Sequence, residues 1–322
     1  MDKCSENNSL NKRDYKLFFE KYAILIAFCI LLVVISVLKP NFLAPANLIN
    51  VLNQTAINGI LAVGITFVLI TAGIDISIGS VAALSGVVAA ILAKAGVPIF
   101  LAFAGGVLAG TLIGVVIGAL VTKGKLAPYI VTLGFLTIIR GLALLISGGR
   151  PVSGLDRAYG VLGNGKMFGV IPVSVIIFAV ITVIAHIILQ HLKIGRYVYA
   201  VGGNPKASEA CGINPNKVKM FVHIVCSLCA GVAGVILSSK IITGQPNMAE
   251  GYELDAIAAA VVGGTSLAGG TGGIPGTLVG ALIIGVIGCG LDFIGVSSYW
   301  QYVVKGTIIV IAVLLDRNKK RQ

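Results

Sequence analysis

Apolar stretches of about 20 residues recur along nearly the whole chain, and they constrain its fold more than any other feature. They include residues 22–38, 97–121, 128–147 and 221–241. Only 11% of the 322 residues are charged, whereas a soluble domain carries about 25%. Because lipid offers no hydrogen bonds to an open backbone, we expect these stretches to be helical. The sequence therefore predicts an all-α fold, a polytopic membrane helix bundle.

The basic residues indicate how the helices are oriented. Of the 24 Lys and Arg residues, five lie in residues 1–21, two in 123–125, five in 193–219 and four in 316–322. Short segments rich in Lys and Arg stay on the cytoplasmic side of a membrane. Neighbouring segments must then be separated by an even number of spans, which predicts about ten spans with both termini cytoplasmic. The count changes if residues 256–273 re-enter the membrane from one side.

Several chemistries are disfavoured. The net charge of +12 is explained by topology, so it does not predict nucleic-acid binding. Cys226 and Cys229 lie in an apolar stretch with no second pair, so no metal site or disulfide is predicted. Residues 160–166 match GxxxxGK, but Met167 replaces the Ser or Thr that binds magnesium, and no strand precedes the motif. We expect no cofactor, no metal and no ATPase of the chain's own.

Two glycine-rich breaks interrupt the apolar pattern at comparable places in the two halves. The first contains Asp75 and Ser77 and separates the apolar runs 56–74 and 81–93, and the second is residues 263–276. An acidic residue between two spans is costly in lipid and marks a broken helix or a cavity. The alternative is a simple cytoplasmic turn in which Asp75 meets water. The sequence alone favours neither reading.

Two predicted helices carry informative residues. Residues 97–121 contain a glycine at every fourth position, so these glycines share one stripe of the helix, Gly106, Gly110, Gly114 and Gly118. Because glycine lets backbones approach closely in lipid, the stripe predicts contact with another helix. The next helix, residues 128–147, carries Arg140. A buried guanidinium would need a carboxylate, carbonyls or water, and the alternative, which we expect, is that Arg140 snorkels toward the membrane interface.

The stretch from Leu192 to Met220 is the main polar interruption, and it predicts a short helix. Asn204 can cap the first free amides, Pro205 suits the first helical position, and Gly212 can end the helix. A helix of about two turns is not stable alone in water, so we expect it to dock on a partner. The alternative is an ordinary basic loop with a surface helix.

Several motifs, in order along the chain, resemble those of one transporter family. Residues 209–213, Glu-Ala-Cys-Gly-Ile, resemble the coupling loop of ATP-binding-cassette (ABC) importer permeases. Residues 73–79 resemble the Gly-Ile-Asp-apolar-Ser-apolar-Gly pattern of the ribose-type sugar permeases. Further matching stretches are residues 42–91, 195–200, 244–270 and 296–301. The chain is identified as a member of the monosaccharide branch of these permeases, with the resemblance covering nearly all of it.

The resemblance implies a division of the chain and a set of partners. Residues 22–315 would form a transmembrane permease domain of the type II ABC importer kind, with broken helices and with residues 193–219 as its cytoplasmic coupling loop. Residues 1–21 and 316–322 would be cytoplasmic tails. Two copies would work as a homodimer in the cytoplasmic membrane. A tandem-domain sugar-import ATPase would hydrolyse ATP below them, and an extracytoplasmic sugar-binding protein would deliver the sugar.

Roles for individual residues follow as expectations. Coupling to the ATPase is assigned to the short helix and its ends, Asn204, Pro205, Ser208, Glu209, Ala210, Gly212 and Ile213. Pathway residues are expected in the polar breaks and loop, namely Asp75, Ser77, Gln245, Thr265 and Ser266. Ribose is the favoured sugar, and allose, xylose, inositol and autoinducer-type furanoses stay open.

Two other classes of function compete with this one. An ion-coupled secondary sugar transporter would use Asp75 or Asp292 as a proton site. Few acidic residues lie in the spans, however, and the capped helix would then have no role. A membrane enzyme is disfavoured because the spans contain no Ser-His-Asp, HExxH or paired-carboxylate signature. Capture of a tandem-domain ATPase would discriminate an importer from both.

Overall fold

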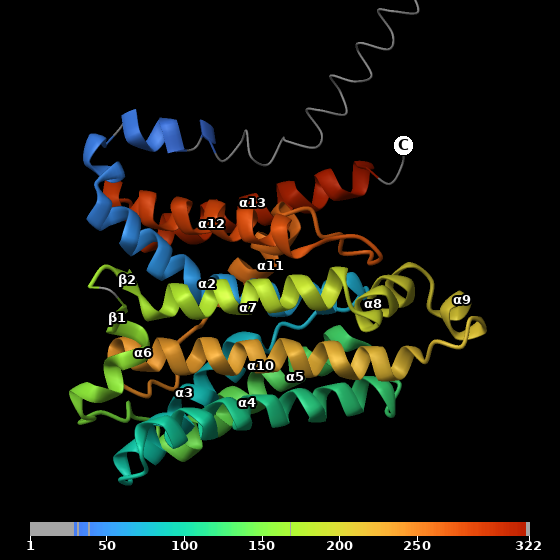
Figure 1. Ribbon diagram of the computed structural model, residues 1–322, viewed down its shortest axis with the longest axis horizontal. Helices are drawn as coiled ribbons and strands as arrows, with labels where there is room; N and C mark the ends of the chain where they lie inside the picture. Colours follow the sequence, from blue (N-terminus) through green and yellow to red (C-terminus); the bar gives the residue numbers. More distant parts are fainter. Residues whose placement is uncertain (1–28, 31, 38, 168, 320–322) are drawn as a thin grey trace, which may run out of the picture.

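A computed structural model describes residues 29–30, 32–37, 39–167 and 169–319 of the chain. Within these residues the fold is a bundle of helices (Figure 1), and the strands form one hairpin, β1 (Lys166–Met167) with β2 (Ile171–Pro172). The prediction of an all-α membrane bundle is confirmed. The predicted tail 1–21 and most of the predicted first span, 22–38, lie outside the described residues.

The helices coincide with the apolar stretches, although α2 begins at residue 45 instead of 56 and α10 at residue 215 instead of 221. In chain order they are η1 (Pro40–Leu43), α2 (Pro45–Ile70), α3 (Ile78–Lys94), α4 (Ile99–Thr122), α5 (Pro128–Ser147), η2 (Arg157–Gly160), α6 (Val161–Asn164), α7 (Val173–Gln190), α8 (Lys193–Gly203), α9 (Pro205–Ala210), α10 (Pro215–Ile241), α11 (Tyr252–Val262), α12 (Ile274–Ile294) and α13 (Ser298–Lys319). Proline occupies the first turn of α2, α5, α9, α10 and α12, where its missing N–H costs no hydrogen bond. Helix α5 has the predicted bounds, whereas α13 continues past residue 315 into the predicted tail.

Six helices of the described part, α2, α4, α5, α7, α10 and α12, are long and apolar enough to cross a membrane. Helix α3 is apolar but has only 17 residues. The predicted total of about ten spans stays a prediction.

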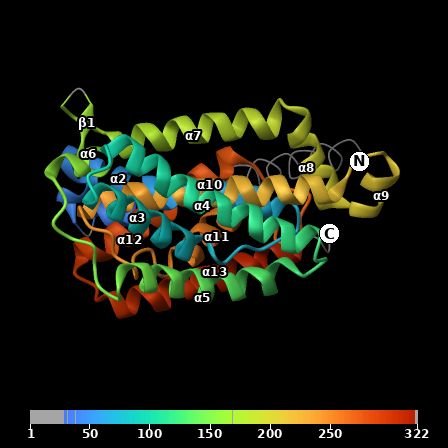
Figure 2. The ribbon, with the colours of Figure 1, turned by 90° about the horizontal axis from the view of Figure 1, so that it is seen from below.

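Helices α2 and α10 form the centre of the bundle (Figures 1 and 2). The apolar window of α2 is 83% buried and that of α10 is 67% buried, against 22% for α5 and for α7. Perimeter helices expose large apolar side chains such as Phe100, Leu145 and Val183. An apolar perimeter is the surface expected to face lipid.

The glycine stripe of α4 lies against α3 and α10. A Cβ at Gly110 would stand 2.5 Å from Ser85 Oγ and 3.0 Å from the Cα of Gly231. One turn farther along, a Cβ at Gly114 would meet Ser227 of α10 at 2.6 Å. Glycine therefore permits an approach of α4 to α10 that any side chain would block.

The two glycine-rich breaks divide long helical paths into shorter pieces. Residues 71–77 separate α2 from α3, and residues 263–273 separate α11 from α12. Other elements satisfy backbone groups of each break, since Thr132 donates to the carbonyl oxygen of Ile74 and Gly270 N donates to the carbonyl oxygen of Ile70, as polar backbone within an apolar bundle requires. The breaks place polar groups inside the bundle.

Candidate functional site

Helix α9 projects from one end of the bundle, here called the α9 end (Figures 1 and 2). The side-chain oxygen of Asn204 caps it by accepting a hydrogen bond from Ala207 N at 3.1 Å. The helix is followed by Gly212, whose φ of +80° is a left-handed conformation that glycine adopts without strain. Both end signals read from the sequence are thereby confirmed.

One side of α9 packs against the bundle, and the other side is exposed. Glu209 and Ala210 are exposed, whereas Ser208 is buried and its hydroxyl donates to the carbonyl oxygen of Asn204 at 2.8 Å. Ile213, which follows the helix, packs against the main apolar core. The exposed side of α9 is therefore free to meet another protein, while its inner side is anchored.

Helix α8, which the sequence analysis did not predict as a helix, joins the α9 end to the end of α2 and to the second break. The hydroxyl of Tyr199 donates to the carbonyl oxygen of Gly272 at 2.9 Å, and burial raises the pKa of Tyr199 above its ordinary value. Gly202 lies so close to the carbonyl oxygen of Ile70 that a Cβ would overlap it. Gly270 N donates to the same oxygen at 2.8 Å. The end of α2, the end of α8 and the second break therefore form one packed junction.

Asp75, in the first break, is completely buried and is held by three polar contacts. Its Oδ1 accepts from Ser77 N at 3.0 Å and from Ser77 Oγ at 2.6 Å. Its Oδ2 lies 3.3 Å from Nδ1 of His223, on α10, which is also buried. These contacts decide between the two readings of the sequence. The break is a broken helix inside the bundle, and Asp75 does not meet water.

Local sequence signals could not reveal the partner of Asp75, because His223 lies 148 residues farther along the chain. Within its own stretch, His223 is a lone histidine in an apolar helix. Such a residue has no distinguishing pattern until the break that faces it is known. The other two histidines, His186 and His191, face each other edge-on at a centroid distance of 6.0 Å.

Arg140 corrects another expectation. Its guanidinium does not snorkel outward, because Nη1 donates to the carbonyl oxygens of Pro246 at 2.6 Å and Met248 at 2.9 Å. These carbonyls belong to loop 243–251, which precedes α11. A positive charge satisfied by two carbonyls is tolerated inside a membrane protein. Arg140 therefore fixes the path of loop 243–251.

The residues expected in the pathway do not form one exposed cluster. Asp75, Ser77, Thr265 and Ser266 are at most 2% exposed, whereas Gln245 of loop 243–251 is exposed. Thr265 packs against Gly272 within the second break. In this conformation, four of the five are therefore closed off from any solute.

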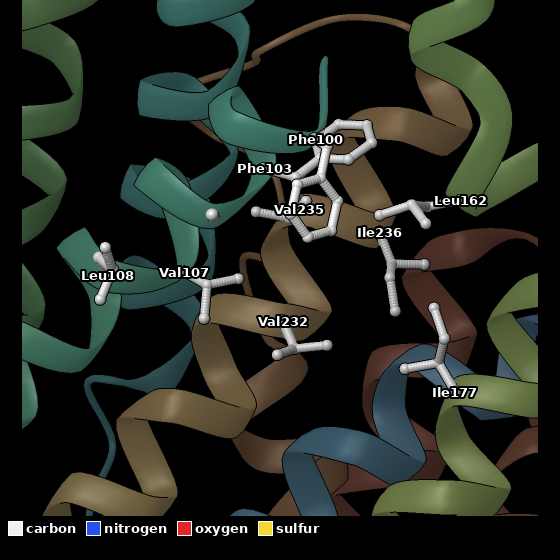
Figure 3. Close-up of a pocket in the computed structure, with 10 residues that line it drawn as sticks. Phe100, Phe103, Val107, Leu108, Leu162, Ile177, Val232, Val235 and Ile236 are labelled. Carbon is white, nitrogen blue, oxygen red and sulfur yellow. The ribbon is translucent and has the colours of Figure 1, made fainter. Parts of the chain in front are cut away.

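A cavity of about 460 Å³ lies between α4, α6, α7 and α10, but its chemistry does not suit a sugar (Figure 3). Its lining is entirely apolar, Phe100, Phe103, Ala104, Val107, Leu108, Leu162, Ile177, Val232, Val235 and Ile236. A sugar needs hydrogen-bonding groups that fix its hydroxyls. The cavity is therefore suited to apolar occupants. The described residues also contain no group of three His, Cys, Asp or Glu side chains that could hold a metal ion.

Comparison with known proteins identifies the family. Residues 47–313 match the family described as branched-chain amino acid transport system / permease component. The chain belongs to this family. It is a transporter subunit and a multi-pass protein of the bacterial inner membrane, not an enzyme.

Individual relatives are similar over nearly their whole length. The ribose import permease protein of Bacillus subtilis is 47% identical over 292 residues, 90% of each chain. The ribose import permease protein of Escherichia coli is 45% identical over 300 residues, 92% of this chain and 93% of that protein. The D-allose transport system permease protein of Escherichia coli is 37% identical over 97% of this chain and 96% of its own length. No solved structure matches the chain.

Proposed function

We propose that this chain is the membrane-spanning permease subunit of an ABC importer for a monosaccharide, and that the monosaccharide is ribose. The observation that carries the proposal is the 44–47% identity to ribose import permeases of several bacteria over about nine-tenths of the chain. Identity to the D-allose permease is lower, at 37%. The ranking favours ribose over allose.

The capped helix α9 supports the assignment of partners. An importer of this kind needs an ATPase on one side and a sugar-binding protein on the other. We assign α9, through Glu209, Ala210 and its end residues, to the contact with a tandem-domain ATPase. The α9 end then faces the cytoplasm, which agrees with the basic residues of 193–219. Both chain termini are proposed to lie on that side.

The pathway itself is proposed to run between two copies of the chain. Polar residues of the breaks would line it in one of two alternating conformations. Asp75, Ser77, Thr265 and Ser266 are closed off here, so their exposure would accompany the change of conformation. Gln245 would meet the sugar first, because it is exposed on loop 243–251.

The function is tested in liposomes that contain the chain with its ATPase. ATP is supplied on the α9 side, and the binding protein and radiolabelled ribose are supplied on the other. The account predicts ribose accumulation that requires ATP hydrolysis and that unlabelled ribose suppresses more strongly than allose or xylose. Uptake that proceeds without ATP and follows a proton gradient would instead establish a secondary transporter.

A further inference from the structure

The buried pair of Asp75 and His223 joins the helix that follows α9 to the first break. Helix α10 begins only a few residues after α9, and the connection is closed by hydrogen bonds. Ile213 N donates to the carbonyl oxygen of Ser208 at 3.0 Å, and Asn214 Oδ1 accepts from Lys217 N at 3.1 Å. A connection closed in this way leaves little slack between the two helices. A displacement of α9 therefore reaches the start of α10.

His223 is placed to receive that displacement. It is the ninth residue of α10, which puts it about 12 Å along the helix axis from the start at a rise of about 1.5 Å per residue. Its ring is 2% exposed, and Asp75 is fully buried. Nδ1 of His223 and Oδ2 of Asp75 lie 3.3 Å apart, close enough to share one proton in a hydrogen bond. A buried polar group that loses its hydrogen-bond partner costs free energy, so a displacement of His223 favours a matching displacement of Asp75.

Asp75 in turn controls the start of α3. Its other oxygen holds both the amide and the hydroxyl of Ser77, the residue before the first turn of α3. That first turn touches the second half of the chain. At Gly79, a Cβ would overlap the carboxylate of Glu253 and come within 2.6 Å of the carbonyl oxygen of Ala249. The start of α3 is therefore seated against loop 243–251 and α11.

We propose that the Asp75–His223 pair is the positioning contact through which movement of α9 reaches α3 and loop 243–251. The proposal rests on the proposed function and adds the residues that link ATP hydrolysis to the pathway. Both residues are buried in this conformation, and the proposal concerns their contact with each other, not any contact of Asp75 with the sugar. They act by keeping α10 and the first break in register. A chain of contacts is shown to couple two sites only when breaking one contact changes that coupling. The test therefore measures the ratio of ATP hydrolysed to ribose transported.

The test compares two substitutions at one position. His223→Leu removes the Nδ1 donor, whereas His223→Asn places an amide N–H near the position of Nδ1. The complex is reconstituted with its ATPase and binding protein, and ATP hydrolysis and ribose uptake are measured together. His223→Leu is expected to raise the ATP-to-ribose ratio at least tenfold while hydrolysis continues. His223→Asn is expected to stay within about threefold of wild type.

Three comparisons keep the outcome decisive. The control is His186→Leu on α7, the same change at a histidine whose ring faces His191, and it should leave the ratio unchanged. A wild-type ratio in an assembled His223→Leu complex would overturn the proposal. If that variant does not assemble, the smaller change His223→Ala decides: a raised ratio supports the proposal, and a wild-type ratio overturns it. Failure of the proposed function itself is recognised separately, because the wild-type complex would then show no ATP-driven ribose uptake.

Discussion

The guanidinium of Arg140, in the middle of α5, lies 2.9 Å from the carbonyl oxygen of Met248 and holds loop 243–251 inside the bundle. A second bond, to Pro246, shares the same nitrogen. Charged side chains in membrane helices usually face the protein interior and bind polar groups there. Here a lone arginine of one helix sets the path of the segment that leads into α11.

Replacing Arg140 tests this role. Arg140→Leu removes both hydrogen bonds from a charged donor, each of which contributes about 1.5–3 kcal/mol. Loop 243–251 should then detach, and Met248, which is 7% exposed, should become reactive. Oxidation of Met248 by peroxide, followed by mass spectrometry, measures this. Arg140→Lys is the control, since it keeps a charged donor. Equal oxidation rates in the Leu variant and wild type would show that the loop is held by other contacts.

The glycine stripe of α4 gives a prediction about packing. Gly110→Leu would drive a side chain into Ser85 and Gly231, and overpacking of this kind costs about 1–3 kcal/mol or more. Thermal unfolding in detergent should shift to lower temperature. Gly134→Leu on α5 is the matched control, because no atom lies within 4 Å of its added Cβ. Similar stability of the two variants would show that α4 does not pack closely on α3 and α10.

Two neighbouring glycines in α8 should behave in opposite ways. An added Cβ at Gly202 overlaps the carbonyl oxygen of Ile70, whereas an added Cβ at Gly203 meets nothing within 4 Å. Gly203→Ala should stabilise the helix by up to about 1 kcal/mol. Gly202→Ala should loosen the junction with α2 and lower ATP-driven uptake at least tenfold. Uptake measured for both variants at equal expression checks this. Equal uptake by the two variants would show that the junction between α2 and α8 accommodates the added methyl group without loss of transport.

Substitutions at Lys305 and Asp255 are expected to have non-additive effects on stability. Lys305 Nζ on α13 lies 2.7 Å from Asp255 Oδ2 on α11, and Asp255 is almost fully buried. Lys305→Met leaves the carboxylate of Asp255 without its cationic partner. Breaking a buried pair in this way lowers the free energy of unfolding by about 3–5 kcal/mol. Asp255→Asn together with Lys305→Met removes both charges and should recover much of the loss. A double variant less stable than Lys305→Met alone would contradict this reading of the pair.

Sequence patterns predicted the local features of this protein and missed the long-range ones. The bounds of α5, the caps of α9 and the position of the break around Asp75 were predicted, because proline, glycine and capping residues act within a few positions. Whether that break lies inside the bundle or in water was left open. The partner of Asp75 and the partners of Arg140 were not, since each contact joins residues more than 100 positions apart. Apolar periodicity shows that a helix is buried but not which neighbour it meets.

The central claim is that α9 docks on an ATPase, and capture of that ATPase tests it most directly. The detergent-solubilised chain is mixed with an extract of its own cells, and bound proteins are identified by mass spectrometry and assayed for ATP hydrolysis. Glu209→Lys reverses a charge on the exposed face of α9. Glu250→Lys is the control, because it reverses an exposed charge on loop 243–251. The account predicts that wild type and Glu250→Lys capture a tandem-domain ATPase and that Glu209→Lys captures at least tenfold less. Equal capture by Glu209→Lys, or no ATPase bound to wild type, would contradict it.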